Sequence, residues 1–429
     1  MIQVEIDAIK NNKTILYYIV SSSLKRYFLH NKFIVKYDFQ INDVPESILI
    51  CPALGYLLPL AFATGQEIYT HTLDKEFYKS AQTLRFIVKT LYPELPADKV
   101  KINVKELRNN NFVYNRRAAL FFSGGVDSTS LLLSHINEKP MLITIWGSDI
   151  RLNEEEKWRK VLSYVKLVAN KFDLKYTTIV FNDILDQSLL TSNFIRKLKG
   201  RRWWVGLASG ITLPTLASPL VKLNIKRLYV ASGVPKRVIH PWSDSHVVLN
   251  SIQISSMKII CDDYELSRYQ KILNIKNNLD KVKCKSFTLK IRACSKSTRL
   301  WNCNYCEKCA RTIIMFMLAG LDPNEFGFNI DIKKYLKYLK ESLDKSWLKL
   351  TPEELLFWLD IKNLSKYHPH MRFLSSYNYE NFVNMKKEML LADAFRLINR
   401  IFGINSIIAR KVINKFQSFF NMRINIKKI

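Results

Sequence analysis

Short apolar runs alternate with amphipathic stretches in the middle of the chain. The runs are AALFF at 118–122, MLITIW at 141–146, TTIVF at 177–181 and RLYVAS at 227–232, each flanked by polar turns. Uninterrupted apolar runs of this length are typical of strands buried on both faces. Between them, helices are predicted at 127–138, 153–172 and 204–224. Repeated strand and helix units predict a doubly wound parallel sheet of the α/β class, with ligands at the carboxyl ends of the strands.

The two ends of the chain differ from this central pattern. Residues 1–115 mix the alternating run FIVKYDFQI with the helical stretch KEFYKSAQTLRFIVKTLYPEL, which predicts an N-terminal α/β lobe before a central domain at 116–325. Residues 326–429 are predicted to be helical and basic, with Asp393 as the last acidic residue. The basic residues beyond it are Arg396, Arg400, Arg410, Lys411, Lys415, Arg423, Lys427 and Lys428. This region is either a helical cap on the central domain or an amphipathic surface that contacts a membrane or RNA.

Composition adds the size and the charge of the protein. With 429 residues, 48% of them hydrophobic, the chain can bury at least two cores. The most apolar window, at 50–65, contains two prolines and is shorter than the roughly 18–20 residues of a membrane span. Because the first residues also lack the pattern of a secretory signal, we expect a soluble, cytoplasmic protein.

The net charge of the chain is strongly positive. Lys and Arg number 66 against 37 Asp and Glu, which gives a formal charge of +29. Such a charge favours anionic partners, among them nucleotides, nucleic acid, glycan precursors or a membrane surface. The alternative interpretation is a solvated, lysine-rich surface without a specific partner.

One corner of the predicted sheet has the chemistry of a phosphate site. The motif SGGVDSTS follows the run at 118–122 and opens the helix at 127–138, so the N–H groups of a helix N-terminus lie beside two glycines. The candidate phosphate ligands are Ser123, Gly124, Gly125, Ser128 and Thr129. Asp127 would repel a bare phosphate, and a magnesium ion between them would remove this conflict. The simpler interpretation is a capped turn between a strand and a helix.

The motif resembles the SGGxDS loop of the N-type PP-loop ATP pyrophosphatases. The resemblance implies a fold like that of the adenine nucleotide alpha-hydrolases (HUP-like), with the loop on the β- and γ-phosphates of ATP and magnesium beside it. It also implies attack at the α-phosphate, release of pyrophosphate, and a catalytic role for Asp127. Members of the family bind adenine at the end of the second strand, which here is IWGSDI with Gly147. A capped helix start explains Ser148 and Asp149 equally well.

A cluster of cysteines indicates a metal site. Cys294, Cys303, Cys306 and Cys309 have the spacing C-x8-C-x2-C-x2-C. Four thiolates suit tetrahedral zinc and leave no position for water, so the site would be structural. An iron–sulfur cluster and unrelated core cysteines are the alternatives.

The cysteine spacing resembles the zinc site of the 7-cyano-7-deazaguanine synthase family, which also carries a PP-loop. Most of residues 40–320, including WNCNYCEKCARTIIMFMLAG, is similar to a group of longer PP-loop proteins that includes the cell-wall glutamate epimerase acting on a UDP-N-acetylmuramoyl dipeptide. This second resemblance implies adenylation of a carboxylate on a cell-envelope or capsule precursor.

The segment VASGVPKRVIHPWSDSHVVLN leaves the fourth predicted strand at the edge where ligands gather. Trp242, Ser243 and Asp244 are candidate substrate contacts. His246 is a candidate general base, and the alternative is an inert loop histidine. Arg268 follows Glu265 by three residues and is either an ordinary helix ion pair or a clamp for an anionic substrate group.

These features predict an enzyme that uses ATP, Mg²⁺ and structural Zn²⁺ to adenylate a small anionic molecule through its carboxylate. A second hypothesis is an RNA-modifying or RNA-thiolating enzyme, with Cys261 or Cys284 as the sulfur carrier. A third is a non-catalytic module that binds ATP without turnover.

Overall fold

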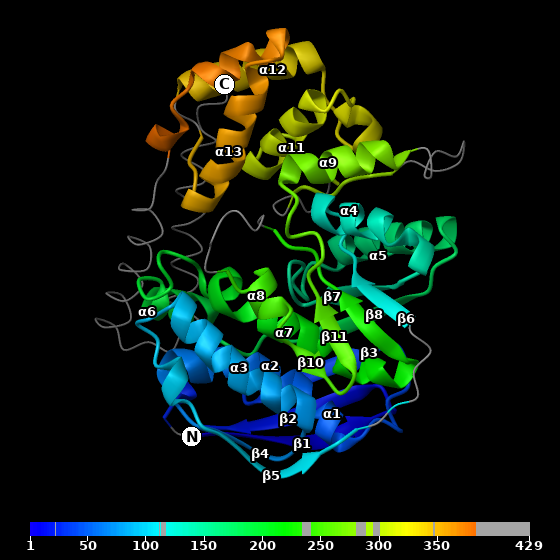
Figure 1. Ribbon diagram of the computed structural model, residues 1–429, viewed down its shortest axis with the longest axis vertical. Coiled ribbons are helices and arrows are strands. Elements are labelled where there is room, and N and C mark those ends of the chain that lie inside the picture. Colours follow the sequence, from blue (N-terminus) through cyan, green and yellow to red (C-terminus); the bar gives the residue numbers. More distant parts are fainter. Residues whose placement is uncertain are drawn as a thin grey trace.

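The computed structural model of the chain describes residues 1–21, 23–110, 112, 117–233, 242–279, 289–294, 301–345 and 348–382. Across these ranges eleven strands form one sheet in the order β10-β11-β9-β6-β7-β8-β3-β2-β1-β4-β5 (Figure 1). The strands are β1 (Ile2–Lys10), β2 (Thr14–Val20), β3 (Lys32–Tyr37), β4 (Ile68–Asp74), β5 (Ile102–Arg108), β6 (Arg117–Phe121), β7 (Met141–Trp146), β8 (Tyr176–Phe181), β9 (Ile225–Tyr229), β10 (Gln253–Ile254) and β11 (Met257–Ile260).

The helices lie on both faces of the centre of this sheet and in a cap beyond it (Figure 1). They are α1 (Glu46–Leu49), α2 (Cys51–Thr64), α3 (Lys75–Leu91), α4 (Val126–Ser134), α5 (Glu155–Lys171), α6 (Gln187–Phe194), α7 (Ser209–Leu216), α8 (His246–Leu249), α9 (Arg268–Asn277), α11 (Glu307–Leu318), α12 (Ile332–Asp344) and α13 (Pro352–Ser365). Successive side chains of β6 point to opposite faces, so Ala118 and Leu120 share a core with α4 and α5, while Ala119 packs into a second core with α7.

The central strands confirm the α/β class. β11, β9, β6, β7 and β8 pair in parallel, as the four apolar runs predict. The fourth predicted strand is displaced, because β9 ends at Tyr229 and the chain turns away before Ser232. The sheet as a whole is mostly parallel rather than purely parallel, since β1–β2, β2–β3, β3–β8 and β10–β11 are antiparallel pairs.

The N-terminal strands belong to the same sheet as the central ones. β3 pairs with β8, where Val35 lies opposite Phe181. Side chains from β1 to β4, from α2 and from α7 share one buried core. The division of the chain at 115 and 325 stays a prediction, but the first segment and the central strands are continuous through these hydrogen bonds.

Two apolar segments are buried in that core. α2 is apolar on all sides, as expected of a helix with no face toward water. Among the described residues, one run, Trp204–Leu223, is long and apolar enough to cross a membrane, but 78% of that window is buried within the fold. It therefore has the place of a core element of the fold.

A helical cap covers the end of the molecule away from the N-terminal strands (Figure 1). α9, α11, α12 and α13 enclose their own core, and α4 contributes Val126 and Leu133 to it. The predicted helices after 325 are confirmed as far as residue 382. The basic residues from Arg396 to Lys428 lie outside the described residues.

Candidate functional site

The motif SGGVDSTS forms a tight loop between β6 and α4. Gly124 has the left-handed φ of +72°, and a Cβ there would lie 3.2 Å from the ring of Tyr164. The hydroxyl of Ser123 lies 3.3 Å from that of Ser128 and accepts a hydrogen bond of 3.4 Å from the N–H of Gly125. The N–H groups of the first turn of α4 have no partner within the helix. This corner therefore has the backbone geometry of an anion site at the carboxyl edge of the sheet, and the binding of phosphate there stays a prediction.

A neighbouring segment, 289–294, donates hydrogen bonds to the carbonyl groups of the loop. The N–H of Arg292 donates to the carbonyl of Gly124 at 2.7 Å. The Nε of the same residue donates to the carbonyl of Ser123 at 3.0 Å, and its Nη2 lies 4.0 Å from Asp149. Because these acceptors are occupied, the loop is fixed with its carbonyls toward Arg292.

Asp127 is paired with two cations that the sequence motif does not contain. A capping box of Ser267 and Gln270 starts α9, and this places Arg268 and Lys271 in its first turn. Arg268 Nη2 lies 2.9 Å from Asp127 Oδ2, and Lys271 Nζ lies 3.5 Å from Oδ1. The ion pair of Arg268 thus goes to the loop aspartate, not to Glu265. Sequence reasoning found no lysine near the loop because Lys271 arrives from another helix.

Lys271 is almost fully buried and joins three elements. Its side chain is 1% exposed, lies 2.7 Å from Asp263 Oδ2 and donates to the carbonyl of Ser232 at 2.5 Å. Asp263 in turn accepts from the N–H of Ser232 at 3.0 Å. The end of β9, the segment after β11 and the start of α4 therefore meet at one ammonium group.

One oxygen of Asp127 is suited to a cation. Its Oδ1 is buried and accepts no hydrogen bond from any described residue. Magnesium is commonly held by one or two carboxylates together with phosphate oxygens, so a carboxylate oxygen suits the ion, although Lys271 Nζ already lies 3.5 Å from it. The role of Asp127 beside magnesium stays a prediction. Thr129 has a similar orphan, since its Oγ1 is buried without a partner in the described part of the chain.

Gly147 occupies a position that no other residue can fill without rearrangement. It follows β7 with φ +111°, and a Cβ would lie 2.0 Å from the carbonyl oxygen of Phe181. Gly147 donates to the carbonyl of Ile150 at 3.0 Å, which closes a turn beside the loop. The predicted adenine-binding strand end therefore lies next to the phosphate corner, because β6 and β7 are neighbours.

Some of the candidate substrate residues at 242–246 are hydrogen-bonded or packed against the fold, and others face the charged side chains near the loop. Ser243 is of the first kind. Its hydroxyl accepts from the N–H of Gly210 at 3.2 Å and donates to the carbonyl of Val205 at 3.0 Å. The backbone of Ser243 also packs so closely that a Cβ on Gly210 would meet its oxygen at 1.6 Å. The ring of Trp242 lies 3.3 Å from the Cβ position of Gly233, so it packs on the end of the strand.

Asp244 belongs to the charged group around the loop. Burial raises the pKa of Asp244 to about 6; the charge of Asp127 acts in the same direction, and a backbone hydrogen bond and Lys271 oppose the shift. His246 begins α8 and stacks on the ring of Tyr264 at 4.4 Å. The charge of Asp127 acts on the carboxyl of Asp244.

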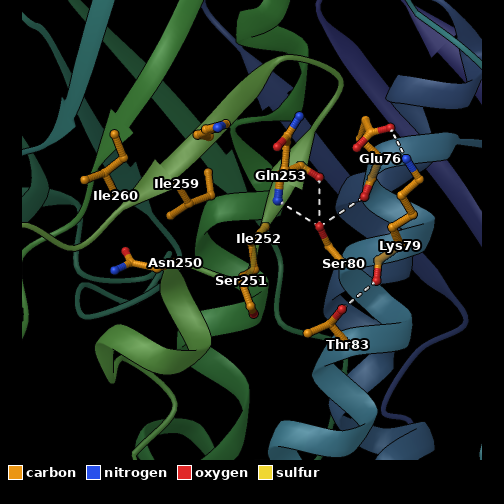
Figure 2. Close-up of a pocket in the computed structure, with 11 residues that line it drawn as sticks. Glu76, Lys79, Ser80, Thr83, Asn250, Ser251, Ile252, Gln253, Ile259 and Ile260 are labelled. Atoms are coloured by element: carbon orange, nitrogen blue, oxygen red, sulfur yellow. Dashed lines mark hydrogen bonds and ion pairs between the residues drawn. The ribbon is translucent and has the colours of Figure 1, made fainter.

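A separate cleft of about 480 Å³ lies between α3 and the β10–β11 hairpin (Figure 2). Ser80 lines it and is already bonded, since its hydroxyl accepts from the N–H of Gln253 at 2.9 Å. Glu76 and Lys79 at its rim pair with each other at 2.7 Å. None of the loop residues lines this cleft, so it is distinct from the phosphate corner.

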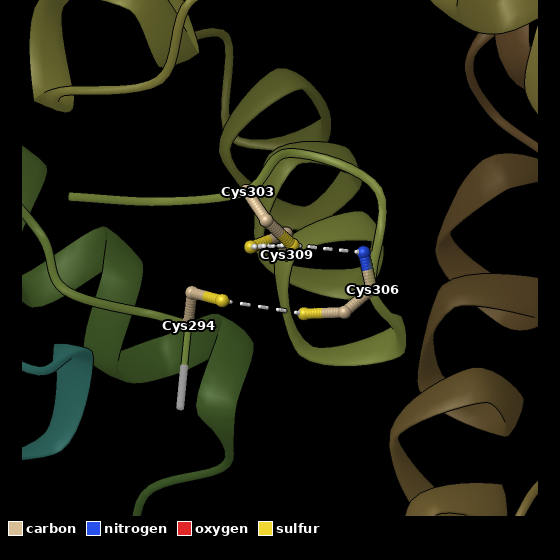
Figure 3. A group of neighbouring side chains, drawn as sticks. All are labelled: Cys294, Cys303, Cys306 and Cys309. Atoms are coloured by element: carbon tan, nitrogen blue, oxygen red, sulfur yellow. Dashed lines mark hydrogen bonds between the residues drawn. The ribbon is translucent and has the colours of Figure 1, made fainter. Parts of the chain in front are cut away.

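The four predicted cysteines converge at the base of the cap (Figure 3). Their sulfur atoms all lie within 4.8 Å of one another, and the Cys303–Cys309 and Cys294–Cys306 pairs are 3.9 Å apart. Tetrahedral coordination at about 2.3 Å requires sulfur atoms about 3.8 Å apart, so two of the pairs already have nearly this spacing and the four cysteines could hold one metal ion. Hydrogen bonds from Cys303, Cys306 and Cys309 hold the pKa of Cys294 below its ordinary value.

The cysteine site is supported by a buried polar frame. The Oδ1 of Asn302 accepts from the N–H groups of Ala293 and Cys294 at 2.9 and 3.1 Å. Cys306 is the N-cap of α11, where the helix dipole favours a thiolate. Cys294 is two residues from Arg292, so the metal site and the loop are joined by one short segment.

No family model, no curated protein and no solved structure matches this chain. The interpretation of the site therefore depends on the geometry of its own residues. Within the described residues, sequence reasoning missed Lys271, Arg292 and Asp263. The spacing of Arg268 and Lys271 on one helix face was the available signal for the first of these.

Proposed function

We propose that this protein is a PP-loop ATP pyrophosphatase with a HUP-like central sheet, which adenylates the carboxylate of a small anionic molecule. The observation that carries this proposal is the loop between β6 and α4. It combines a left-handed Gly124, a helix N-terminus and two hydroxyl groups with the cations of α9. Such a corner suits the phosphates of a nucleotide.

In the proposed reaction a carboxylate oxygen of the substrate attacks the α-phosphorus of ATP. A new oxygen–phosphorus bond forms, the bond to the bridging oxygen of the β-phosphate breaks, and pyrophosphate leaves with the electron pair. The loop N–H groups, Ser123 and Ser128 would bind the leaving group, while Gly147 would leave room for the nucleoside. Magnesium, when bound, would supply charge neutralisation at the phosphate oxygens. Catalysis would come mainly from positioning and charge neutralisation.

The acyl adenylate would then be captured by a second nucleophile. The position of Asp244 in the charged group favours it over His246 as the base that accepts a proton in that step, because a carboxyl with a pKa of about 6 is ionised at neutral pH and still basic.

The cysteine cluster supports a structural zinc ion. All four ligands come from the protein, which leaves no open position for chemistry. A cluster of free thiolates also suits the reducing cytoplasm, where we place the protein.

RNA thiolation is less well supported than adenylation of a small acid. Cys261 is buried, and this raises the pKa of its thiol to about 12, so it remains a protonated and weak nucleophile at neutral pH. The other candidate sulfur carrier, Cys284, lies outside the described residues. The non-catalytic hypothesis predicts ATP binding without any product.

The decisive test is the identity of the nucleotide product. Purified protein, ATP, Mg²⁺ and a metabolite extract from its own cells would be incubated, and the products resolved as AMP with pyrophosphate or ADP with phosphate. We expect AMP and pyrophosphate that depend on the extract. Asp127→Asn should lower the rate at least about 100-fold, because the loop loses a charged cation ligand.

The matched control is Glu155→Gln, which removes an acidic side chain at the exposed start of α5. It should leave the rate unchanged. ADP as the product, or AMP formation that survives in Asp127→Asn, would contradict the proposed mechanism. Tight ATP binding with no product under any condition would establish the binding module instead.

A further inference from the structure

A second arginine lies behind Arg268 in the cap. Arg311, on α11, is 4% exposed, so its guanidinium group is almost fully removed from water. Its nearest acidic partner is Glu307, at 3.5 Å from Nε to Oε1. That oxygen also accepts a hydrogen bond of 3.0 Å from the indole of Trp358. Glu307 is therefore an ion-pair partner of Arg311 without a hydrogen bond of good geometry.

Two donor atoms of Arg311 are left without a hydrogen bond in the described chain. Neither Nε nor Nη1 makes a hydrogen bond to any described residue, although both are buried. A guanidinium offers five donors in a planar fork, and leaving a charged donor buried and unsatisfied costs more than leaving a neutral one. Arg268 also has an unused donor, since its buried Nε makes no hydrogen bond to any described residue.

The two arginines share one aromatic platform. The guanidinium carbon of Arg311 lies 4.1 Å from the ring centroid of Phe357, and that of Arg268 lies 5.3 Å from the same centroid. Phe357 belongs to α13, so the platform comes from the C-terminal cap. Stacking fixes the planes of both groups while leaving their edges able to donate to an oxyanion.

The pair extends the charged group away from the loop. Arg268 contacts Asp127, whereas Arg311 has no contact with a residue of the SGGVDSTS motif among the ion pairs of the described chain. Two cations on one ring repel each other, and an anion between them would reduce this repulsion and accept from the unused donors of both. An anion at Arg311 would therefore sit beyond the phosphates of the nucleotide, on the cap side of Arg268.

We propose that Arg268 and Arg311, stacked on Phe357, form a subsite for a second oxyanion of the acid that is activated, either a carboxylate or a phosphate that does not react. This proposal rests on the proposed function, because it assigns the subsite to the substrate of the same reaction. It makes the substrate at least dianionic: one group attacks ATP and the other is held by the arginine pair.

The test measures anion binding with the nucleotide already bound. Inorganic phosphate and, separately, glutarate would be titrated calorimetrically into the full-length, metal-loaded protein saturated with Mg²⁺ and a non-hydrolysable ATP analogue. We expect one anion to bind alongside the analogue. Arg311→Met should weaken that binding at least tenfold and leave the affinity for the analogue within twofold. The tighter of the two probes identifies the second group as phosphate or carboxylate.

Two further variants allow the proposal to be tested if Arg311→Met does not fold. Arg311→Lys and Arg268→Lys retain the charge but lose the fork, and each should weaken anion binding at least threefold with an unchanged unfolding transition. The proposal is wrong if neither probe binds to the nucleotide-loaded protein, if the variants bind the probe as tightly as the wild type, or if the Arg311 variants weaken the nucleotide as much as the probe. Absence of AMP in the product assay would refute the proposed reaction without affecting this measurement.

Discussion

The cysteine cluster and the phosphate corner are both groups of polar side chains placed against buried cores, but only one of them is closed. The four sulfur atoms lie within 4.8 Å of one another and leave room for a single ion. At the loop, Asp127 Oδ1 is buried without a hydrogen bond in the described chain, and so are Nε and Nη1 of Arg311 in the cap behind it. A closed cluster indicates a structural role, whereas charged groups with unused hydrogen-bonding atoms beside a helix N-terminus favour a place for a ligand.

The largest expected effect tests the closed site. Cys309→Ser should abolish stoichiometric metal binding and lower the free energy of unfolding by at least about 5 kcal/mol, because the ion joins segment 289–294 to α11. Metal analysis and chemical unfolding measure this. Cys261→Ala removes a buried cysteine outside the cluster and should keep the metal. If the purified protein is brown and contains iron and sulfide, the four cysteines hold an iron–sulfur cluster and not zinc.

Next in size is the loss of the ammonium group at the corner. Lys271→Met should cost about 3–5 kcal/mol in urea unfolding, because it leaves Asp263 buried without its cation. Adding Asp263→Asn should recover part of that loss. The control Lys160→Met breaks an exposed pair with Glu156 and should cost less than about 1 kcal/mol. Equal losses of unfolding free energy in the two lysine variants would show that the buried ion pair of Lys271 contributes no more to stability than an exposed pair.

A smaller effect separates close approach from backbone conformation. Gly147 and Gly320 both have positive φ, but only Gly147 faces a backbone oxygen at 2.0 Å, whereas Gly320 faces the flexible end of Lys276 at 3.5 Å. Gly147→Ala should cost roughly 3 kcal/mol and Gly320→Ala about 1 kcal/mol, as measured by thermal unfolding. Similar costs would mean that φ alone sets the penalty.

The smallest effect concerns pH. The pKa of Asp244 is raised by burial to about 6, above its ordinary 3.8, so the folded state takes up the proton more readily than the unfolded state. Its contribution to stability is therefore largest at low pH and is lost as the pH rises toward 6. Relative to the wild type, Asp244→Asn should gain on the order of 2 kcal/mol between pH 4 and pH 7. A stability difference that stays constant over this range would contradict the shift.

Sequence reasoning located the elements that local patterns determine. The apolar runs gave β6, β7 and β8 within a residue or so, because a strand buried on both faces needs an unbroken run. The pairing of β3 with β8 was not predictable, since partner choice between distant strands leaves no local pattern. The same limit applied at the site: the motif identified the loop, but which helix would bring Lys271 to Asp127 depended on how α9 packs.

The chemical character of single residues was also only partly predictable. Ser243 has a hydroxyl group that could contact a substrate, yet this hydroxyl is hydrogen-bonded to the backbone of Gly210 in α7 and of Val205 just before it. Arg268 offered two interpretations, and the packing of α9 against α4 selected the contact with Asp127. The roles of these two residues depend on their neighbours in the folded structure, and the amino-acid sequence alone does not show those neighbours.

Segment 289–294 has a thermodynamic consequence. Cys294 belongs to the cysteine cluster, and Arg292 in the same segment donates hydrogen bonds to the carbonyls of Ser123 and Gly124. If ordering this segment favours both the ion and the nucleotide, the two bind cooperatively, and linkage makes the effect mutual. Nucleotide should then slow the extraction of the metal by a chelator, and a cell short of that metal would hold protein whose affinity for ATP has fallen before the fold is lost.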